Sequence, residues 1–246
     1  MKHKRPEDFG DKCALFFTMR LRWFADTFFA KRYGHRAVVL ETVAGVPGMV
    51  AGMWSHLRSL RKMQPDDRGW IRTLLAEAEN ERMHLMIFIE IAKPNWFERW
   101  MIITAQFLFW HFYMFLYIFF PKVAHRMVGY FEEQAVVSYT SYLKAIEIGK
   151  IKNIDAPEIA KNYYGLPSDS KLRDVVIAVR EDERGHAQEN HRMADVLNEK
   201  SNMSTLSILN NIRKANPDYN NMRQWSGFFF DKQFELPLDI NSTQMG

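Results

Sequence analysis

Two short stretches of the sequence decide its interpretation: Asn80-Glu81-Arg82-Met83-His84 and Asp182-Glu183-Arg184-Gly185-His186. Each contains Glu-x-x-His inside a segment whose apolar residues recur at helical spacing. Positions i and i+3 share one face of a helix, so the carboxylate and the imidazole of each stretch can point at one metal ion. A lone motif of this kind is usually a solvated pair, and it is the repetition that favours a metal site.

Two isolated glutamates extend the pattern. Glu41 lies between Val38-Val39-Leu40 and Val43-Ala44, and Glu132 lies between Tyr130-Phe131 and Ala135-Val136-Val137. A carboxylate on an apolar helix face needs a partner, because burying it alone is strongly unfavourable. Four helices then supply Glu, Glu-x-x-His, Glu and Glu-x-x-His, the ligand set of a di-iron or di-manganese carboxylate bundle. The predicted metal ligands are Glu41, Glu81, His84, Glu132, Glu183 and His186.

The charge and donor chemistry agree with this interpretation. Four carboxylates balance two divalent ions, and oxygen donors with imidazoles suit iron or manganese. The alternative for Glu41 is a helix-end salt bridge with Arg36. The neighbouring acidic residues are expected to be surface charges; they are Glu77, Glu79, Glu133 and Glu181.

The sequence predicts an all-α fold, with no convincing strand. Apolar periodicity and breakers at Pro65, Pro94 and Pro121 divide the chain into long helices joined by short loops. We expect a ferritin-like di-iron four-helix bundle with two additional membrane-surface helices. The expected helices span about 15–33, 35–63, 67–92, 95–120, 122–149 and 169–198.

The domain organisation follows from these limits. Residues 1–14 are expected to form an N-terminal arm, 15–200 the di-iron bundle, and 201–246 a loosely ordered tail rich in Asn, Ser and Gln. The 246 residues suffice for one ordinary domain. No apolar segment follows the basic start at Met1–Arg5, so no secretory signal peptide is expected, and no transit peptide is visible.

Composition excludes several classes of protein. A single cysteine, Cys13, rules out an intrachain disulfide framework and a cysteine-cluster metal site. The formal net charge is only +4 and no basic stripe stands out, so no nucleic-acid partner is expected. Aromatic residues make up 14% of the chain, which raises the question of a membrane interface.

The segment from Trp100 to Phe120 contains no charged residue and is long enough to cross a bilayer. A span here would separate Glu41, Glu81 and His84 from the other ligands, so the four-helix site could not assemble. Ten of its 21 residues are aromatic, which suits the interfacial layer. We therefore expect the helices near 15–33 and 95–120 to form a monotopic patch on one leaflet of a membrane. The alternative is a buried core helix or a dimer interface, with His111 as a core or interface residue.

Combined, these motifs resemble the alternative oxidases, the mitochondrial cyanide-insensitive ubiquinol oxidases. The resemblance covers roughly residues 20–198, and Gly34-His35-Arg36-Ala37 is most similar to the trypanosomatid type. The residues that carry it are Leu40-Glu41-Thr42-Val43-Ala44, Asn80–Leu85, Glu132-Glu133-Gln134-Ala135, Ser138-Tyr139-Thr140 and Arg180–His186.

The resemblance implies a non-electrogenic oxidase that couples oxidation of ubiquinol to four-electron reduction of O₂ to water. It implies two iron ions held by the four glutamates, with His84 and His186 as ligands or close neighbours of the ligands. It also implies a homodimer on the matrix side of the mitochondrial inner membrane.

The resemblance further assigns roles to individual residues. Asn80 and Asp182 would hold the histidines by hydrogen bonds, and Tyr139 would be the redox-active tyrosine. Tyr139 also lies two helical turns after Glu132, so it can share the face of that ligand; the alternative is a core tyrosine. The implied quinol-binding residues are Arg22, Asp26, Arg36, Leu40, Ala135 and Ser138.

The chain departs from the family pattern at four positions: Gln134, Tyr164, Glu181 and Arg184. None of them removes a predicted ligand. Three other functions remain open from the residues alone. A membrane-bound di-iron quinone hydroxylase would share the chemistry, a ferritin-like iron-handling protein would be a soluble cage, and a metal-free bundle would be purely structural.

Overall fold

The computed structural model describes residues 3–29, 32–63 and 69–201. These residues contain only helices and one isolated bridge between Asp155 and Lys171, so the predicted all-α fold is confirmed. The predicted tail at 201–246 lies, apart from the end of the last helix, outside the described residues. The helices are α1 Phe9–Phe29, α2 Tyr33–Lys62, α3 Trp70–Ala92, α4 Trp96–Phe119, α5 Pro121–Glu147, α6 Glu158–Tyr164 and α7 Leu172–Ser201.

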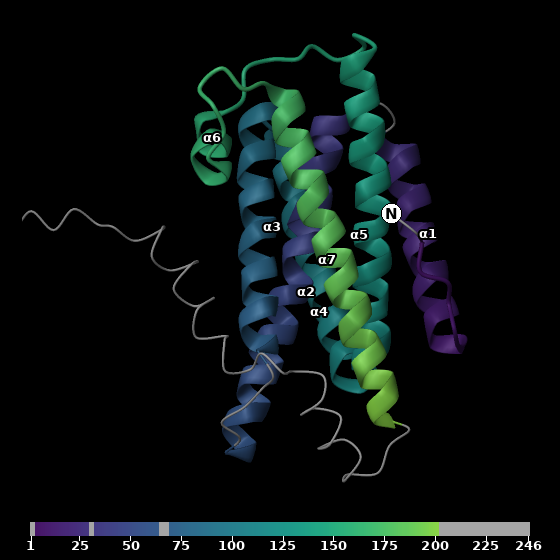
Figure 1. Cartoon of the computed structure of the whole chain (residues 1–246). Helices are drawn as coiled ribbons and strands as arrows, with labels where there is room; N and C mark the ends of the chain where they lie inside the picture. The colour runs from purple at the N-terminus through teal and green to yellow at the C-terminus, as the bar shows by residue number, and fades with distance from the viewer. Residues whose placement is uncertain (1–2, 30–31, 64–68, 202–246) are drawn as a thin grey trace, which may run out of the picture. The chain divides into compact units, whose positions relative to one another are not determined.

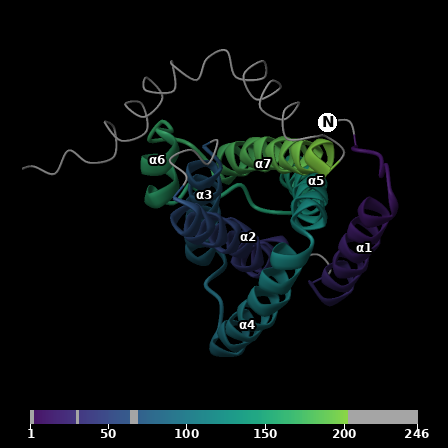
Figure 2. The same ribbon diagram turned by 90° about the horizontal axis from the view of Figure 1, so that it is seen from below.

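Four long helices, α2, α3, α5 and α7, form a bundle (Figure 1). Viewed along the helices, α4 lies on the side away from α7, and α1 lies alongside α5 (Figure 2). Helices α2 and α3 make close backbone contact, because a Cβ at Gly48 would overlap the carbonyl oxygen of Leu74. The four helices of the bundle are the ones that carry the predicted ligands.

Two apolar clusters fill the bundle at different levels. One is centred on Val50, Leu74, Tyr130 and Met193, and the other on Val38, Ile87, Tyr139 and Val179. On α2, α3 and α7, each predicted ligand lies between a member of one cluster and a member of the other. The ligands therefore occupy a layer with apolar side chains on either side, which keeps water out of it.

The helix limits depart from expectation at the N-terminus. Helix α1 begins at Phe9 and not near residue 15, because the Asp8 side chain accepts a hydrogen bond from the Asp11 amide and caps the first turn. It ends at Phe29, and α2 begins at Tyr33. The arm predicted at 1–14 is thus partly helical.

A second departure is α6, which the sequence analysis placed in a loop. Its seven residues begin after Pro157 and end before Gly165, whose positive φ of 62° terminates the helix. Such a short helix shows no repeat of apolar residues that would distinguish it from a loop.

Helix α4 is not a buried core helix. Only 17% of its most apolar window is buried, and most of its aromatic side chains face outward. His111 is exposed and its Nδ1 lies 2.7 Å from the carbonyl oxygen of Phe107, so the core role considered for it is wrong. By length and composition, α2 and α4 could each cross a membrane, and α2 is largely occupied by its contacts within the bundle.

Candidate metal centre

The predicted ligands converge in the middle of the bundle. Glu41 comes from α2, Glu81 and His84 from α3, and Glu183 from α7, and all four are buried. Each offers a ligand atom, and these atoms all lie within 4.8 Å of one another. The sequence motifs therefore bring together a set of donors that can hold a metal ion.

His84 is at the centre of this group. Its Nδ1 lies 3.2 Å from a Glu183 oxygen, 3.4 Å from a Glu41 oxygen and 3.5 Å from a Glu81 oxygen. Its other nitrogen, Nε2, lies 3.1 Å from Asp182 Oδ2. The Nδ1 edge of the ring thus faces the carboxylates, while the Nε2 edge contacts Asp182.

The remaining two predicted ligands adjoin the same group. His186 Nδ1 lies 2.6 Å from Glu81 Oε1, and its ring centre lies 6.3 Å from that of His84. Glu132 on α5 is buried and interacts with Glu183, its strongest charged neighbour. All six predicted ligands therefore lie in one connected cluster.

Many polar atoms in this cluster are buried without a hydrogen-bond partner. They are Glu41 Oε2, both Glu81 oxygens, His84 Nδ1, Glu183 Oε1 and His186 Nδ1. Buried polar atoms are normally paired, because an unpaired one loses its hydration without compensation. Oxygen and imidazole donors that face one another and have no hydrogen-bond partner outside the cluster fit bound divalent cations.

Electrostatics support the same conclusion. Burial and the charge of Glu81 raise the pKa of Glu41 to about 8, and burial with Glu81 and Glu41 raises that of Glu183 to about 8. Burial and Glu183 raise the pKa of Glu132 well above its usual value. Without a metal these carboxyl groups hold protons, because the protein supplies too little positive charge.

Glu81 on α3 and His186 on α7 behave differently, because a carboxylate and an imidazole face each other there. Burial opposes ionisation of Glu81, but His84 and His186 outweigh it and lower the pKa of that carboxyl. Burial also opposes protonation of His186, yet Glu81 outweighs it and raises the histidine pKa to about 9. Protons on the imidazoles thus take the place of a cation.

Asp182 fixes the orientation of His84. Its Oδ2 accepts hydrogen bonds from Asn80 Nδ2 at 3.0 Å and from the Tyr164 hydroxyl at 2.8 Å, and it faces His84 Nε2. Asn80 also donates to the Tyr163 hydroxyl at 2.8 Å. Asn80 and Asp182 were expected to hold both histidines. In the described contacts Asp182 faces His84, and Asn80 acts on that histidine through its hydrogen bond to Asp182. Tyr164, one of the four departures from the family pattern, still donates a hydrogen bond to Asp182 through its hydroxyl.

Tyr139 lies directly against the cluster. Its hydroxyl donates a hydrogen bond to Glu41 Oε1, and its ring stacks on Phe88 with the centres 5.6 Å apart. Burial and the charges of Glu41 and Glu183 raise its pKa well above 10. Tyr139 is therefore a neutral hydrogen-bond donor to a predicted ligand.

Three of the six predicted quinol-binding residues, Arg22, Asp26 and Arg36, contact one another between α1 and α2. Asp26 pairs with Arg22 at 3.3 Å and with Arg36, and Arg22 also donates to the side chain of Gln134. Gln134, a departure from the family pattern, thus contacts one of the predicted quinol-binding residues. The remaining three are partly buried on α2 and α5; they are Leu40, Ala135 and Ser138, whose hydroxyl has no hydrogen-bond partner.

Several expectations about nearby charges are wrong. Glu41 does not pair with Arg36, because Asp26 takes that arginine. Glu77 and Glu133 are buried, whereas Glu79 and Glu181 are exposed as expected. Arg184 pairs with Glu181 at the surface.

The sequence analysis also missed a buried polar chain beside the centre. Asn190 Nδ2 lies 2.9 Å from both Glu77 oxygens and 3.1 Å from the His186 carbonyl oxygen, and Asn190 Oδ1 lies 3.0 Å from His125 Nδ1. Asn190 follows His186 by one helical turn and so shares its helix face, and this spacing could have predicted that Asn190 lies beside the cluster.

Comparison with known proteins agrees with the geometry. The family model described as "Alternative oxidase" matches residues 1–195. The chain is 52% identical over 195 residues to "Ubiquinol oxidase 1c, mitochondrial" of Arabidopsis thaliana, covering 79% of this chain and 59% of that protein. It is 52% identical to "Ubiquinol oxidase 2, mitochondrial" of Nicotiana tabacum over the same share of this chain and 65% of that protein. The chain therefore spans about three fifths of the length of these relatives.

Proposed function

Because the chain belongs to the alternative oxidase family, we propose that it is a ubiquinol oxidase that reduces O₂ to water. Two ubiquinol molecules supply the four electrons and four protons that one O₂ requires. The observation that carries the proposal is the buried carboxylate and imidazole cluster, in which several donor atoms have no hydrogen-bond partner. Its position between two apolar clusters suits a reaction from which bulk water is excluded.

Two iron ions are the proposed cofactor. Glu41, Glu81, Glu132 and Glu183 would hold them, with His84 and His186 as ligands or immediate neighbours of the ligands. Bound there, iron supplies electrons to O₂ and accepts them again from the quinol. Asp182 would keep the His84 ring in the orientation that presents Nδ1 to the carboxylates.

Tyr139 is proposed to supply one electron and its phenolic proton during cleavage of the O–O bond. The hydrogen bond from its hydroxyl gives the proton a direct path to Glu41 Oε1. Oxidation of the quinol then returns the electron and proton to the tyrosine.

The quinol head group is proposed to bind beside Arg22, Asp26 and Arg36. Their guanidinium and carboxylate groups can donate to and accept from the two oxygens of the ring. The Ser138 hydroxyl, which is buried without a partner, adds a further donor on α5. Leu40 and Ala135 contribute apolar surface for the ring.

We further propose attachment to one leaflet of the mitochondrial inner membrane, on its matrix side, as a homodimer. Large apolar side chains project outward from α1 and α4; they include Phe16, Trp23, Phe24, Trp100, Phe107, Leu108, Phe115 and Phe119. Such aromatic residues favour the layer between lipid head groups and acyl chains. Protease added to either side of sealed vesicles tests this: cleavage from one side only is expected, and cleavage from both sides would contradict it.

Oxygen uptake with added ubiquinol, measured together with product analysis, tests the enzymatic proposal. We expect two ubiquinones and two waters for each O₂ consumed. Oxygen inserted into the quinone ring would indicate the hydroxylase alternative. Oxidation of free ferrous iron without quinol oxidation would indicate the iron-handling alternative.

A further inference from the structure

The buried side chains of helix α1 are small or polar; they are Asp11, Ala14, Thr18 and Ala25. Its larger apolar contacts come from Leu15 and Phe17, which are partly buried, and Phe17 stacks on Phe112 with the ring centres 4.9 Å apart. Burial of small side chains removes little apolar surface from water, so a specific polar contact can add to the attachment of this helix.

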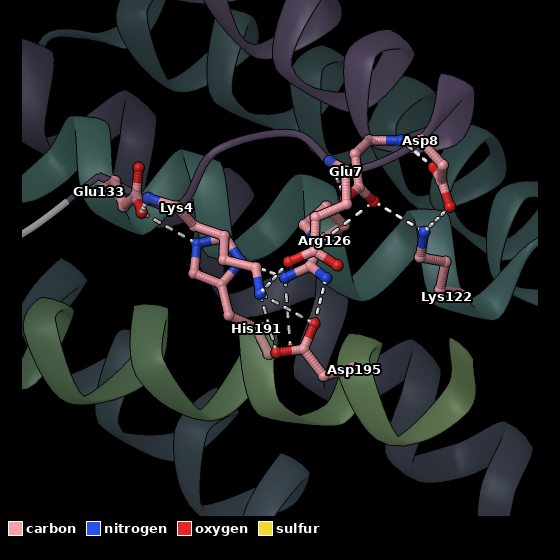
Figure 3. A network of polar contacts seen from close by, with 9 residues as sticks. Lys4, Glu7, Asp8, Lys122, Arg126, Glu133, His191 and Asp195 are labelled. Atoms are coloured by element: carbon pink, nitrogen blue, oxygen red, sulfur yellow. Dashed lines mark hydrogen bonds and ion pairs between the residues drawn. The ribbon is translucent and has the colours of Figure 1, made fainter. Parts of the chain in front are cut away.

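A buried ion-pair network also attaches the start of α1 (Figure 3). Asp11 and Arg126, on α1 and α5, are both fully buried, and Arg126 Nε donates to Asp11 Oδ1 at 3.2 Å. The same carboxylate oxygen lies 2.9 Å from Lys122 Nζ. Arg126 also donates to Asp195 on α7, so one guanidinium joins three helices.

The residues before α1 extend this attachment across α5 and α7. The Lys4 amide donates to Glu133 Oε1 at 2.8 Å, and Lys4 Nζ lies 3.1 Å from Asp195 Oδ2. His3 contacts the other Glu133 oxygen, while His191 Nε2 lies 3.0 Å from Glu133 Oε1. Figure 3 shows these contacts as one chain that runs from Glu133 through Lys4 and Asp195 to Arg126.

The attachment point and the proposed quinol-binding residues lie on one face of α1. Asp11 and Arg22 are 11 residues apart in a single helix, which is close to three full turns and about 16 Å along the axis. Arg22 donates to Gln134 of the same α5 helix that carries Arg126. The two helices are thus joined by a polar contact at each end of this face.

We propose that the Asp11–Arg126 pair is a positioning device for the substrate site. It fixes the rotation and axial position of α1, so that Arg22 and Asp26 face Arg36 and Gln134. The proposal rests on the quinol site proposed above. Asp11 and Arg126 touch neither quinol nor metal in this account and act only through α1.

Such a device makes a specific kinetic prediction. Loss of the Asp11 carboxylate leaves Arg126 paired with Asp195, so the guanidinium is not left buried alone. The metal ligands belong to other helices and are unaffected. Quinol binding should weaken while the chemistry after binding stays the same, which separates the effect on KM from that on kcat.

The experiment uses the iron-loaded full chain and compares the wild type with Asp11→Ala, Asp11→Asn and Asp155→Ala. Asp155 forms an exposed ion pair with Lys171, so its variant is a matched loss of a carboxylate away from α1. Three quantities are measured: iron content, KM and kcat for a short-chain ubiquinol, and hydrogen exchange of the α1 amides.

For Asp11→Ala we expect KM to rise about tenfold with kcat within about twofold of the wild type. Exchange of the amides at residues 14–27 should accelerate about tenfold as α1 loosens. Asp11→Asn, which keeps an oxygen acceptor for Arg126, should lie between the wild type and Asp11→Ala. Asp155→Ala should match the wild type in all three measurements.

Unchanged KM and unchanged α1 exchange in Asp11→Ala would overturn the proposal. A joint fall in iron content and kcat would also overturn it, because Asp11 would then have a general structural role. Failure of the oxidase proposal is recognised separately, since the wild type itself would consume no oxygen with quinol. In that case hydrogen exchange of the α1 amides in Asp11→Ala alone tests the positioning role, and an unchanged exchange rate overturns it.

Discussion

In the part of the chain that the structure describes, two of the buried clusters of charged side chains differ in composition. Around Glu41, Glu81 and Glu183, carboxylates face one another and several donor atoms have no hydrogen-bond partner. Around Asp11 and Arg126, acids alternate with bases, and no atom of either residue is left without a partner. The second cluster neutralises itself, whereas the first has an excess of carboxyl groups and could hold metal ions.

The difference explains why burial has opposite meanings in the two clusters. A buried charge is tolerated only when it is paired, protonated or bound to a metal. Arg126 and Asp11 are paired and stabilise the packing of α1. The carboxyl groups of Glu41 and Glu183 instead shift to a raised pKa of about 8, because burial and like charges oppose their ionisation.

The largest expected effect is that of Glu183→Gln. Removing one anionic ligand should abolish iron binding and lower quinol-dependent oxygen uptake by about a thousandfold or more. The metal-free variant should unfold at a higher temperature than the metal-free wild type, because the neutral amide needs no proton on folding, whereas the Glu183 carboxyl must take one up at neutral pH. Metal analysis, oxygen uptake and thermal unfolding check these outcomes. Glu181→Gln, an exposed change two residues away, is the control, and metal loss there would count against the ligand assignment.

Tyr139→Phe is expected to have the next largest effect. The change removes one hydroxyl and keeps the stacked ring, so folding and iron content should survive. If Tyr139 supplies an electron and a proton, oxygen uptake should fall about a hundredfold. Tyr142→Phe, another buried tyrosine of α5, serves as the control and should retain activity. Near-normal oxygen uptake by an iron-loaded Tyr139→Phe protein would rule out the redox role.

Arg126→Met should affect stability without affecting the ligands directly. It leaves the buried Asp11 carboxylate without its guanidinium partner, which typically costs about 3–5 kcal/mol of unfolding free energy. Arg173→Met removes an exposed pair with Glu147 and should cost at most about 1 kcal/mol. Urea unfolding of metal-free proteins measures both. Equal losses in the two variants would show that the Asp11–Arg126 pair is no stronger than a surface pair.

The pH dependence of the metal-free protein tests the sign of the same pKa shifts. The folded-state pKa values of Glu41 and Glu183 are raised from 4.5 to about 8, and that of His186 from 6.5 to about 9. The folded state therefore binds more protons than the unfolded state between about pH 4.5 and pH 9, the limits that these shifts set. Stability should fall as pH rises through this range.

Bound metal replaces those protons and should flatten the pH dependence. Thermal unfolding of metal-free and iron-loaded protein at several pH values tests this. A metal-free protein that becomes more stable from pH 6 to pH 9 would contradict the sign derived from the pKa shifts.

The cluster of predicted ligands could be recognised in the sequence because its pattern is local. Glu81 with His84 and Glu183 with His186 share a helix face through spacing alone, and that spacing survives any packing of the helices. Glu41 and Glu132 could be recognised because apolar neighbours surround each of them in sequence. The fold class followed from the same periodicity.

The self-neutralising cluster could not be predicted, because its partners are remote in sequence. Asp11, Arg126 and Asp195 meet only after α1, α5 and α7 have packed, and each resembles an ordinary surface charge in its own segment. Glu77 and Glu133 were misassigned for the same reason: their partners, Asn190 and His191, lie on another helix.

Titration of metal-free protein with ferrous iron under anaerobic conditions tests the central claim most directly. The account predicts saturation at about two irons per chain, with quinol-dependent oxygen uptake appearing in proportion to bound iron. Glu183→Gln protein in the same titration should bind no iron tightly. Full oxygen uptake by metal-free protein, or wild-type binding that Glu183→Gln leaves intact, would contradict the assignment of the buried carboxylate cluster as the catalytic centre.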